Sequence, residues 1–121
     1  MVSADERPVL VVEDHRAIRE GLETLLRARG YPVLTASTAE DALGILTQGH
    51  RPSVLLLDVM LPGMNGEQLL NEIRKDDRLT DMSVIVVSAA PVTFSNVAAV
   101  FRKPPNIDRL MDTVQRLYQP S

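Results

Sequence analysis

The stretch that decides the fold runs from residue 54 to residue 66 and reads Val54-Leu55-Leu56-Leu57-Asp58-Val59-Met60-Leu61-Pro62-Gly63-Met64-Asn65-Gly66. Its first four residues are continuously aliphatic, which is typical of a strand buried on both faces of a parallel sheet. An acid follows directly, and the proline and glycines beyond it favour a loop. The stretch therefore predicts a buried strand that ends in Asp58, where a loop begins.

Further apolar runs indicate the rest of the sheet. We expect strands at 9–12, 84–87 and 98–101, and a weaker strand at 31–36. Between these runs the apolar residues recur with the period of a helix that buries one face. Because alternating strands and helices are joined by right-handed crossovers, the chain predicts an α/β fold, in which helices cover both faces of an open, doubly wound parallel sheet.

The expected helices are marked by inward apolar positions and by the residues that begin or end them. The first turns Ile18, Leu22, Leu25 and Leu26 inward and ends at Gly30. The second begins at Ser37, turns Ala42, Leu43 and Leu46 inward and ends at Gly49. The third runs from about Glu67 to Lys75, and the last follows Asn106 and turns Ile107, Leu110, Met111, Val114 and Leu117 inward.

The composition narrows the class of protein. The 121 residues suit one domain over residues 1–121, with a core from about 8 to 118. A net charge of −3 without a basic stripe argues against direct nucleic-acid binding. The absence of cysteine excludes disulfides and thiolate metal sites and fits a reducing compartment. No apolar run resembles a secretion signal or a bilayer span, so we expect a cytoplasmic protein without a membrane partner.

Polar residues follow the expected strands at the edge where open parallel sheets bind ligands, beyond the carboxyl ends. Glu13 and Asp14 follow the first strand, and Asp58 follows the run 54–57. Ser88 and Lys103 follow the last two strands. Three carboxylates, a hydroxyl and an ammonium group therefore converge on one edge, which is a set of groups suited to phosphoryl transfer.

The chemistry of phosphoryl transfer explains this set. An aspartate is a poor nucleophile towards a phosphoryl group because both are anionic, so their charges must be neutralised. Mg²⁺ is suited to this task, since it is usually held by one or two carboxylates and phosphoryl oxygens. Asp14, Asp58 and Glu13 are the candidate metal ligands. Lys103 is expected to pair with Asp58 at rest and with a phosphoryl oxygen afterwards, and Ser88 to donate a hydrogen bond to another oxygen.

With these residues in this order, the chain resembles the receiver domains of two-component response regulators over essentially its whole length. The stretch 58–66 is similar to the family's phosphoacceptor loop, in which Met-Pro or Leu-Pro and a closing glycine follow the aspartate. Ser88 follows Asp58 by 30 residues, which also suits the family. The resemblance implies a flavodoxin-like fold like that of the chemotaxis regulator, with strand order 2-1-3-4-5. It also implies a metal ligand from the backbone carbonyl of Met60 and a Lys103–Pro104 bond that is usually cis.

The function that the resemblance implies is that of a phosphoacceptor. Asp58 would receive a phosphoryl group from a histidine kinase or a histidine phosphotransfer protein in a magnesium-dependent reaction. The phosphorylated form would then switch interactions with a downstream protein target or a fused output domain. Such a domain catalyses only its own phosphorylation and dephosphorylation, so it is not expected to be an enzyme acting on other substrates.

Two departures from the family concern the output. Lys103 follows Ser88 by only 15 residues, about two helical turns fewer than usual, so the fourth helix should be short or absent. The aromatic residue that many receivers carry three positions before the lysine is Val100 here, and Phe101 points to the opposite face. We therefore expect phosphorylation to be read through the loop 89–97, with Phe94 or its neighbours repositioned.

Alternative interpretations remain open at this point. Glu13 and Asp14 can also serve only to cap a helix, and Ser88 can be an ordinary turn hydroxyl. A pseudo-receiver that docks proteins without phosphorylation would share the fold, although Asp58 and Lys103 are both present. A phosphohydrolase of the haloacid-dehalogenase type needs a second acid at the position of Met60. A dinucleotide-binding fold is disfavoured because no glycine-rich turn follows the first strand.

Overall fold

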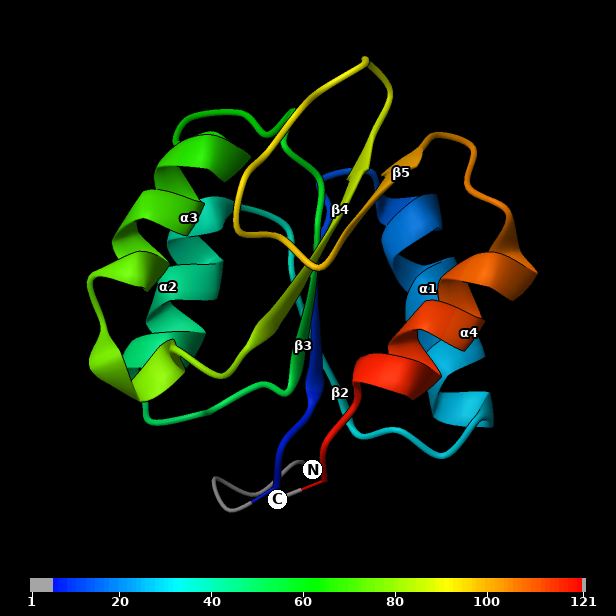
Figure 1. Cartoon of the computed structure of the whole chain (residues 1–121), viewed down its shortest axis with the longest axis horizontal. Coiled ribbons are helices and arrows are strands. Elements are labelled where there is room, and N and C mark those ends of the chain that lie inside the picture. Colours follow the sequence, from blue (N-terminus) through cyan, green and yellow to red (C-terminus); the bar gives the residue numbers. More distant parts are fainter. Residues whose placement is uncertain (1–5, 121) are drawn as a thin grey trace.

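The computed structural model describes residues 6–120, and within them five strands form one parallel sheet (Figure 1). The strands are β1 (Val9–Val12), β2 (Val33–Ala36), β3 (Val54–Leu57), β4 (Ser83–Ser88) and β5 (Ala99–Arg102). Their order is β2-β1-β3-β4-β5, and every neighbouring pair is parallel. The fold class and the strand order expected from the sequence are confirmed.

Helices cover both faces of the sheet. Two helices, α1 (Arg16–Ala28) and α4 (Ile107–Leu117), lie on one face, as Figure 1 shows. The other face is covered by α2 (Ala39–Thr47) and α3 (Gly66–Arg74). A short 3₁₀ helix, η1 (Asp77–Leu79), leads into β4. None of the helices in residues 6–120 is both long enough and apolar enough to pass through a bilayer.

The central strand β3 divides the core into two layers. Leu55 and Leu57 pack on the side of α2 and α3, whereas Val54 and Leu56 pack on the side of α1 and α4. All four side chains are at most 2% exposed. Burial on both faces explains why this strand is continuously aliphatic rather than alternating.

The helix caps agree with the sequence except at α2. Asn106 caps α4 as expected, because its side-chain oxygen accepts a hydrogen bond from the amide of Arg109 at 3.0 Å. The expected cap of α2, Ser37, is wrong by one residue. The hydroxyl of Thr38 instead accepts from the amide of Asp41 at 3.0 Å. Neighbouring hydroxyl residues give equal signals for a cap, so the sequence could not separate them.

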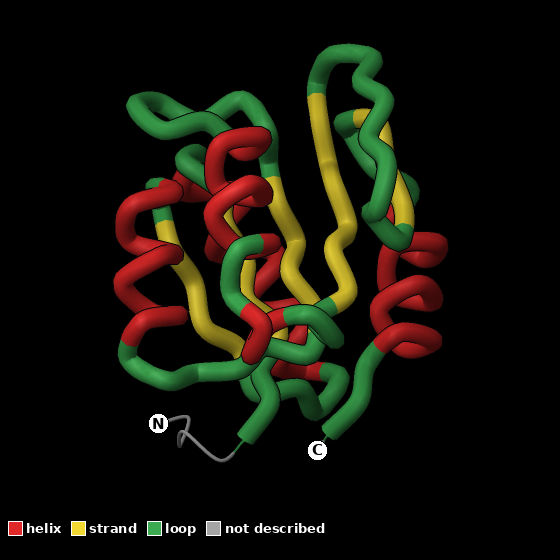
Figure 2. The backbone as a smooth tube through the Cα atoms, turned by 60° about the vertical axis from the view of Figure 1, so that its left-hand side comes forward, coloured by secondary structure: helices red, strands yellow, loops and turns green. Residues whose placement is uncertain are grey.

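A loop joins β4 to β5, where the resemblance to receiver domains implies a helix. Residues 89–98 contain no helix, so the tube between the last two strands is drawn as loop in Figure 2. The helix labelled α4 in Figure 1 follows β5 instead. The expectation of a short or absent fourth helix is confirmed. The partly buried side chains that hold the loop against the α2–α3 side of the core are Val92, Phe94 and Val97.

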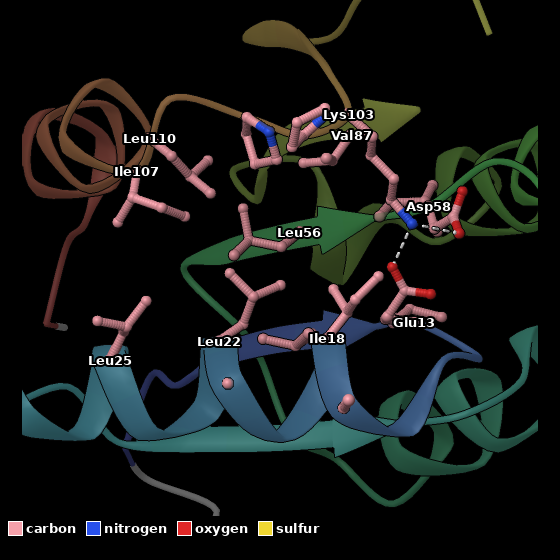
Figure 3. Close-up of a pocket in the computed structure, with 17 residues that line it drawn as sticks. Glu13, Ile18, Leu22, Leu25, Leu56, Asp58, Val87, Lys103, Ile107 and Leu110 are labelled. Carbon is pink, nitrogen blue, oxygen red and sulfur yellow. Dashed lines mark hydrogen bonds and ion pairs between the residues drawn. The ribbon is translucent and has the colours of Figure 1, made fainter. Parts of the chain in front are cut away.

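The space between α1 and α4 departs from the expected burial. Ile18 and Ile107 were expected to face inward, but they are 39% and 38% exposed. Both line an apolar groove of about 400 Å³ between the two helices (Figure 3). On β5, Val100 is 44% exposed, whereas Phe101 packs on the α1–α4 side of the core. The two side chains thus point to opposite faces, as expected.

Candidate functional site

The carboxyl ends of β1 and β3 bring the three candidate acids together. Glu13 and Asp14 follow β1, and Asp58 follows β3, the neighbouring strand. One carboxylate oxygen from each acid lies within 4.8 Å of the others. Glu13 and Asp58 are buried, with 3% and 6% exposure, while Asp14 is exposed. Two acids therefore form the floor of the site, and the third stands at its opening.

Lys103 reaches this acidic cluster from the end of β5. Its Nζ donates hydrogen bonds to Glu13 Oε1 at 2.5 Å and to Asp58 Oδ2 at 3.0 Å (Figure 3). The backbone amide of Lys103 donates to the carbonyl of Ser88 at 2.8 Å, which joins the ends of β4 and β5. The bond between Lys103 and Pro104 is cis. The ammonium group is thus centred between the two buried carboxylates.

The remaining oxygens of the buried acids accept backbone hydrogen bonds. Asp58 Oδ1 accepts from the amide of Met60 at 2.9 Å, and Glu13 Oε2 accepts from the amide of His15 at 3.0 Å. Each acid therefore has one oxygen on Lys103 and one on a backbone N–H. This arrangement satisfies buried charge that would otherwise be costly, and it fixes both carboxylates in place.

Burial and pairing shift the protonation equilibria of the site. Burial raises the pKa of Glu13 above its ordinary value of 4.5, and hydrogen bonds from Lys103 and His15 offset part of the rise. Burial acts to lower the pKa of Lys103, but the hydrogen bonds and charges of Glu13 and Asp58 outweigh it and raise that pKa above 10.5. Lys103 consequently remains charged at neutral pH.

The donor set fits a hard divalent cation. Mg²⁺ binds oxygen ligands, keeps several waters and is held in proteins by few carboxylates. The acids Glu13, Asp14 and Asp58 supply such oxygens from two neighbouring loops. The Met60 side chain is 62% exposed, so the loop after Asp58 is open to solvent at this point. The acids present are consistent with a magnesium site, and the ligand role of the Met60 carbonyl stays a prediction.

Most of the chain, including all the residues of the site, matches one protein family. The family model for the response regulator receiver domain matches residues 9–115. The chain belongs to the response regulator receiver family. Residues 58–65 of this receiver domain form the loop between β3 and α3.

Curated relatives of this receiver domain are transcriptional regulators. The transcriptional regulatory protein AfsQ1 of Streptomyces coelicolor is 44% identical over 71 residues, which are 59% of this chain and 31% of AfsQ1. The probable transcriptional regulator ycf27 of Guillardia theta is 43% identical over 81 residues, which are 67% of this chain and 30% of that protein. The matched segment thus spans less than a third of either relative.

Solved structures agree with the receiver domain over most of its length. TrrA from Thermotoga maritima, solved in complex with Mg²⁺-BeF, superposes with a TM-score of 0.80 and 31% identity, covering 93% of this chain and 99% of TrrA. The receiver domain of the Francisella response regulator 1452 gives a TM-score of 0.83 with 28% identity, covering 93% and 96% of the two chains. Both share the fold described above.

Ser88 lies at the predicted edge, and its hydroxyl has a local partner. The residue ends β4, is fully buried, and its Oγ accepts a hydrogen bond from the amide of Ala90 at 3.3 Å. A hydroxyl that accepts from a backbone amide keeps its own hydrogen for another acceptor. Its donation to a phosphoryl oxygen remains a prediction.

One residue beside the site was missed by the sequence analysis. Arg19 Nη1 donates to the carbonyls of Glu13 at 3.0 Å and of Asp14 at 3.2 Å. The residue lies outside the apolar positions by which α1 was recognised. Hydrophobic periodicity carries no information about such side chains, and a single arginine on a helix surface gives no other signal.

Proposed function

We propose that this receiver domain accepts a phosphoryl group on Asp58 in a magnesium-dependent reaction and thereby switches its protein interactions. The observation that carries the proposal is the position of Lys103, whose ammonium joins Asp58 to Glu13 while Asp14 stands beside them. This arrangement holds a nucleophilic carboxylate in a fixed orientation next to acids suited to a metal ion.

Each residue of the site has a separate role in the proposed phosphoryl transfer. An Asp58 oxygen attacks the phosphorus of a phosphohistidine, so a P–O bond forms as the P–N bond breaks. Mg²⁺ bound by the acids would offset the negative charge of the phosphoryl group. Lys103, already within 3.0 Å of Asp58, needs only a small shift to donate to a phosphoryl oxygen. Ser88 donates to a second oxygen, and water later hydrolyses the acyl phosphate.

The partners follow from the family and are part of the proposal. The donor is a histidine kinase or a histidine phosphotransfer protein, and the output is a downstream protein or a fused domain. Curated relatives are transcriptional regulators, and TrrA was solved with Mg²⁺-BeF, which supports both the output class and the cofactor. The domain would act in the cytoplasm, and it would catalyse only its own phosphorylation and dephosphorylation.

A pseudo-receiver that docks proteins without phosphorylation is the second candidate. The full set of Asp58, Lys103 and neighbouring acids favours the phosphoacceptor, because a docking module has no need for a buried ammonium between two carboxylates. The choice between the two depends on whether Asp58 reacts.

The test is phosphorylation by a small donor. The protein is incubated with Mg²⁺ and acetyl phosphate, and the intact mass is measured for the wild type, Asp58→Ala and the control Asp112→Ala, an exposed acid on α4. We expect one phosphoryl mass on the wild type and the control, none on Asp58→Ala, and none when Mg²⁺ is chelated. An unmodified wild type would leave the pseudo-receiver, and equal labelling of Asp58→Ala would move the site elsewhere.

A further inference from the structure

Arg19 fastens the backbone of the acidic loop that follows β1. It lies in the first turns of α1, and one nitrogen of its guanidinium, Nη1, donates to the carbonyls of both Glu13 and Asp14. Its side chain is partly buried, whereas Arg16 on the same helix is 82% exposed and pairs with Glu20 at 2.8 Å. The two arginines therefore differ in their partners: one binds the loop, the other binds its own helix.

Arg19 bonds two carbonyls that α1 does not satisfy. The first carbonyl used inside the helix is that of His15, which accepts from the backbone amide of Arg19 at 2.9 Å. The carbonyls of Glu13 and Asp14 precede that point, so any protein donor to them must come from outside the backbone ladder of the helix. Arg19 supplies it, and this fixes the peptide planes on either side of the Asp14 Cα atom.

The two acids of the loop are held in different ways. Both carboxylate oxygens of Glu13 are engaged, one by Lys103 and one by the amide of His15. The Asp14 carboxylate is exposed, and its position depends on the backbone that carries it. The contact with Arg19 therefore acts on the backbone of Asp14, whereas its side chain projects into solvent.

We propose that Arg19 is a positioning residue for Mg²⁺, acting through the backbone of Glu13 and Asp14. The inference rests on the proposed function, because it concerns the cation that this function requires. Mg²⁺ demands near-ideal octahedral geometry, so a small displacement of one carboxylate weakens binding. Residues that orient metal ligands without touching the metal change affinity by about 10- to 100-fold when they are replaced.

The positive charge of Arg19 should weaken Mg²⁺ binding, whereas its hydrogen bonds to the loop should strengthen it. The two effects can therefore be told apart by experiment. A cationic side chain near the site repels Mg²⁺, so its removal alone would tighten binding by a few-fold at most in screened solution. Arg19→Lys keeps the charge, but its side chain is one bond shorter, so its nitrogen cannot occupy the position from which Nη1 reaches both carbonyls. Arg19→Gln removes the charge, and Arg16→Gln removes a charge from the same helix without touching the loop.

The experiment is titration calorimetry of MgCl₂ into the full chain without a phosphodonor. We expect the Mg²⁺ dissociation constant to rise about tenfold in Arg19→Lys and Arg19→Gln, and to stay the same or fall in Arg16→Gln. Amide hydrogen exchange of the metal-free protein should be faster in Arg19→Lys at His15, whose amide donates to Glu13 Oε2, with the remaining amides unchanged. That second measurement detects the loss of loop order directly.

The outcomes separate this inference from the proposed function. Wild-type Mg²⁺ affinity in Arg19→Lys, or tighter binding in Arg19→Gln to the extent seen in Arg16→Gln, would overturn the positioning role and leave the magnesium site intact. A wild type that binds no Mg²⁺ would overturn the metal-dependent function itself, and this inference with it. A tenfold loss confined to the Arg19 variants supports both.

Discussion

Lys103 holds together the two buried acids of the site. Without Lys103, the carboxylates of Glu13 and Asp58 would lie buried beside each other with no positive charge between them. The Lys103 side chain is only 18% exposed, and those of the two acids are 4% and 6% exposed. Removing one partner of a buried charge pair leaves an uncompensated charge, which costs about 3 kcal/mol or more. The lysine therefore contributes to folding as well as to the proposed chemistry.

Lys103→Met should consequently be unstable in a way that magnesium corrects. We expect its free energy of unfolding at neutral pH to fall by about 3 kcal/mol. Added Mg²⁺ should restore part of the loss, because the bound cation would neutralise the same carboxylates. Urea unfolding with and without Mg²⁺ measures both effects. The control is Lys75→Met, whose ion pair with Glu72 is exposed and should contribute less than about 1 kcal/mol. Equal losses in the two variants would contradict this account.

The sequence predicted which residues meet at the site but not how they bind one another. Strand ends in a parallel sheet share one edge, so Glu13, Asp58 and Lys103 could be expected together. The pairing of Lys103 with Asp58 was expected, whereas its hydrogen bond to Glu13 was not. A lysine side chain has four rotatable bonds, so its reach across three strands depends on packing that spacing alone does not specify.

At the scale of elements, the start of α3 lies against the loop that begins at Asp58, and Gly66 permits the approach. A Cβ atom at this position would lie 2.6 Å from Val59 Cα and 3.0 Å from the carbonyl oxygen of Asp58. Both are backbone atoms, so relief requires the helix or the loop to move. The first residue of α3 thus limits how the loop that begins at Asp58, the proposed phosphoacceptor, can be arranged.

Gly66→Ala should therefore destabilise the protein and displace the loop. We expect the free energy of unfolding to fall by about 3 kcal/mol, the upper end of the cost of overpacking. The matched control is Gly21→Ala on α1, where a Cβ would meet nothing within 4 Å. There the gain in helix propensity should stabilise the protein by about 1 kcal/mol. Thermal unfolding of both variants tests whether stability falls in Gly66→Ala and rises in Gly21→Ala. Unchanged stability in Gly66→Ala would show that the loop moves aside at little cost.

The loop between β4 and β5 is the element through which we expect phosphorylation to be read. It begins beside Ser88, whose Oγ accepts from Ala90, and it is tied to the end of α3 where Arg74 Nη2 donates to the carbonyl of Ser95 at 2.9 Å. If Ser88 turns towards a phosphoryl group, the Ala90 contact is lost and the loop is released at one end.

Amide shift mapping with and without Mg²⁺ and beryllofluoride tests this readout. We expect the largest changes in residues 89–98 and around Arg74. Arg74→Ala should speed amide exchange in the loop while changing the free energy of unfolding by less than about 0.5 kcal/mol, since the contact is exposed. Shifts confined to α1 and α2 would exclude the loop as the output element.

Elements were easier to predict than their mutual packing. The spacing from Ser88 to Lys103 was too short for a full helix, and the structure has none between β4 and β5. Ile18 and Ile107 lie on the predicted helix faces but are 39% and 38% exposed, because both line the groove between α1 and α4. Periodicity identifies the apolar face of a helix but does not say whether a neighbouring helix approaches closely enough to cover it.

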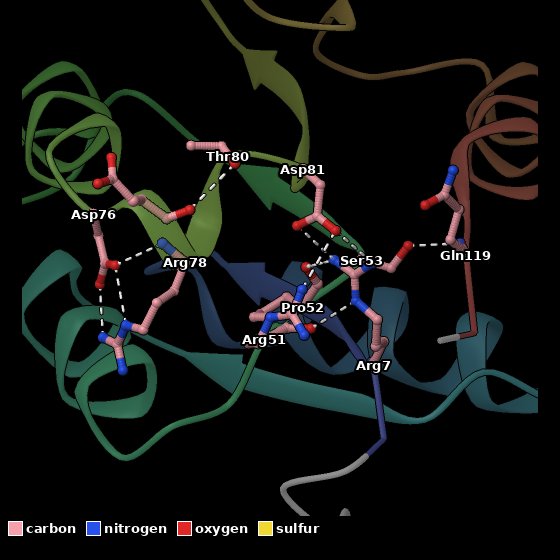
Figure 4. A network of polar contacts seen from close by, with 10 residues as sticks. Arg7, Arg51, Pro52, Ser53, Asp76, Arg78, Thr80, Asp81 and Gln119 are labelled. Carbon is pink, nitrogen blue, oxygen red and sulfur yellow. Dashed lines mark hydrogen bonds and ion pairs between the residues drawn. The ribbon is translucent and has the colours of Figure 1, made fainter.

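At the scale of the whole molecule, segments far apart in the sequence meet at the end of the sheet opposite the acidic site. Arg7 donates to both carboxylate oxygens of Asp81, at 3.1 and 3.2 Å, and to the carbonyl of Pro52 at 3.1 Å (Figure 4). The amide of Gln119 donates to Ser53 Oγ at 2.6 Å, so the segment after α4 also joins this network. No local pattern could have predicted contacts across such sequence separations.

Tyr118 also joins the two ends of the chain, and its ionisation makes the stability of the fold depend on pH. Its hydroxyl donates to the carbonyl of Arg7 at 2.7 Å, and its ring packs edge-on against Tyr31 with centroids 4.8 Å apart. Burial, followed by the charges of Glu6 and Tyr31, raises the pKa of Tyr118 above 10.0. The folded protein therefore holds this proton more tightly than the unfolded chain. The resulting stability is fully present below pH 10 and is lost as the pH rises through the folded pKa.

Tyr118→Phe should lower the free energy of unfolding by about 1 kcal/mol at neutral pH, the net value of one hydrogen bond. It should also remove the alkaline loss, so the wild type and Tyr118→Phe should converge in stability as the pH is raised above 10. Urea unfolding across the alkaline range measures both, with Tyr31→Phe as the control that keeps the Tyr118 hydroxyl and its alkaline loss. If Tyr118→Phe loses stability above pH 10 as steeply as the wild type, ionisation of the Tyr118 hydroxyl does not cause the loss, and another group governs alkaline unfolding.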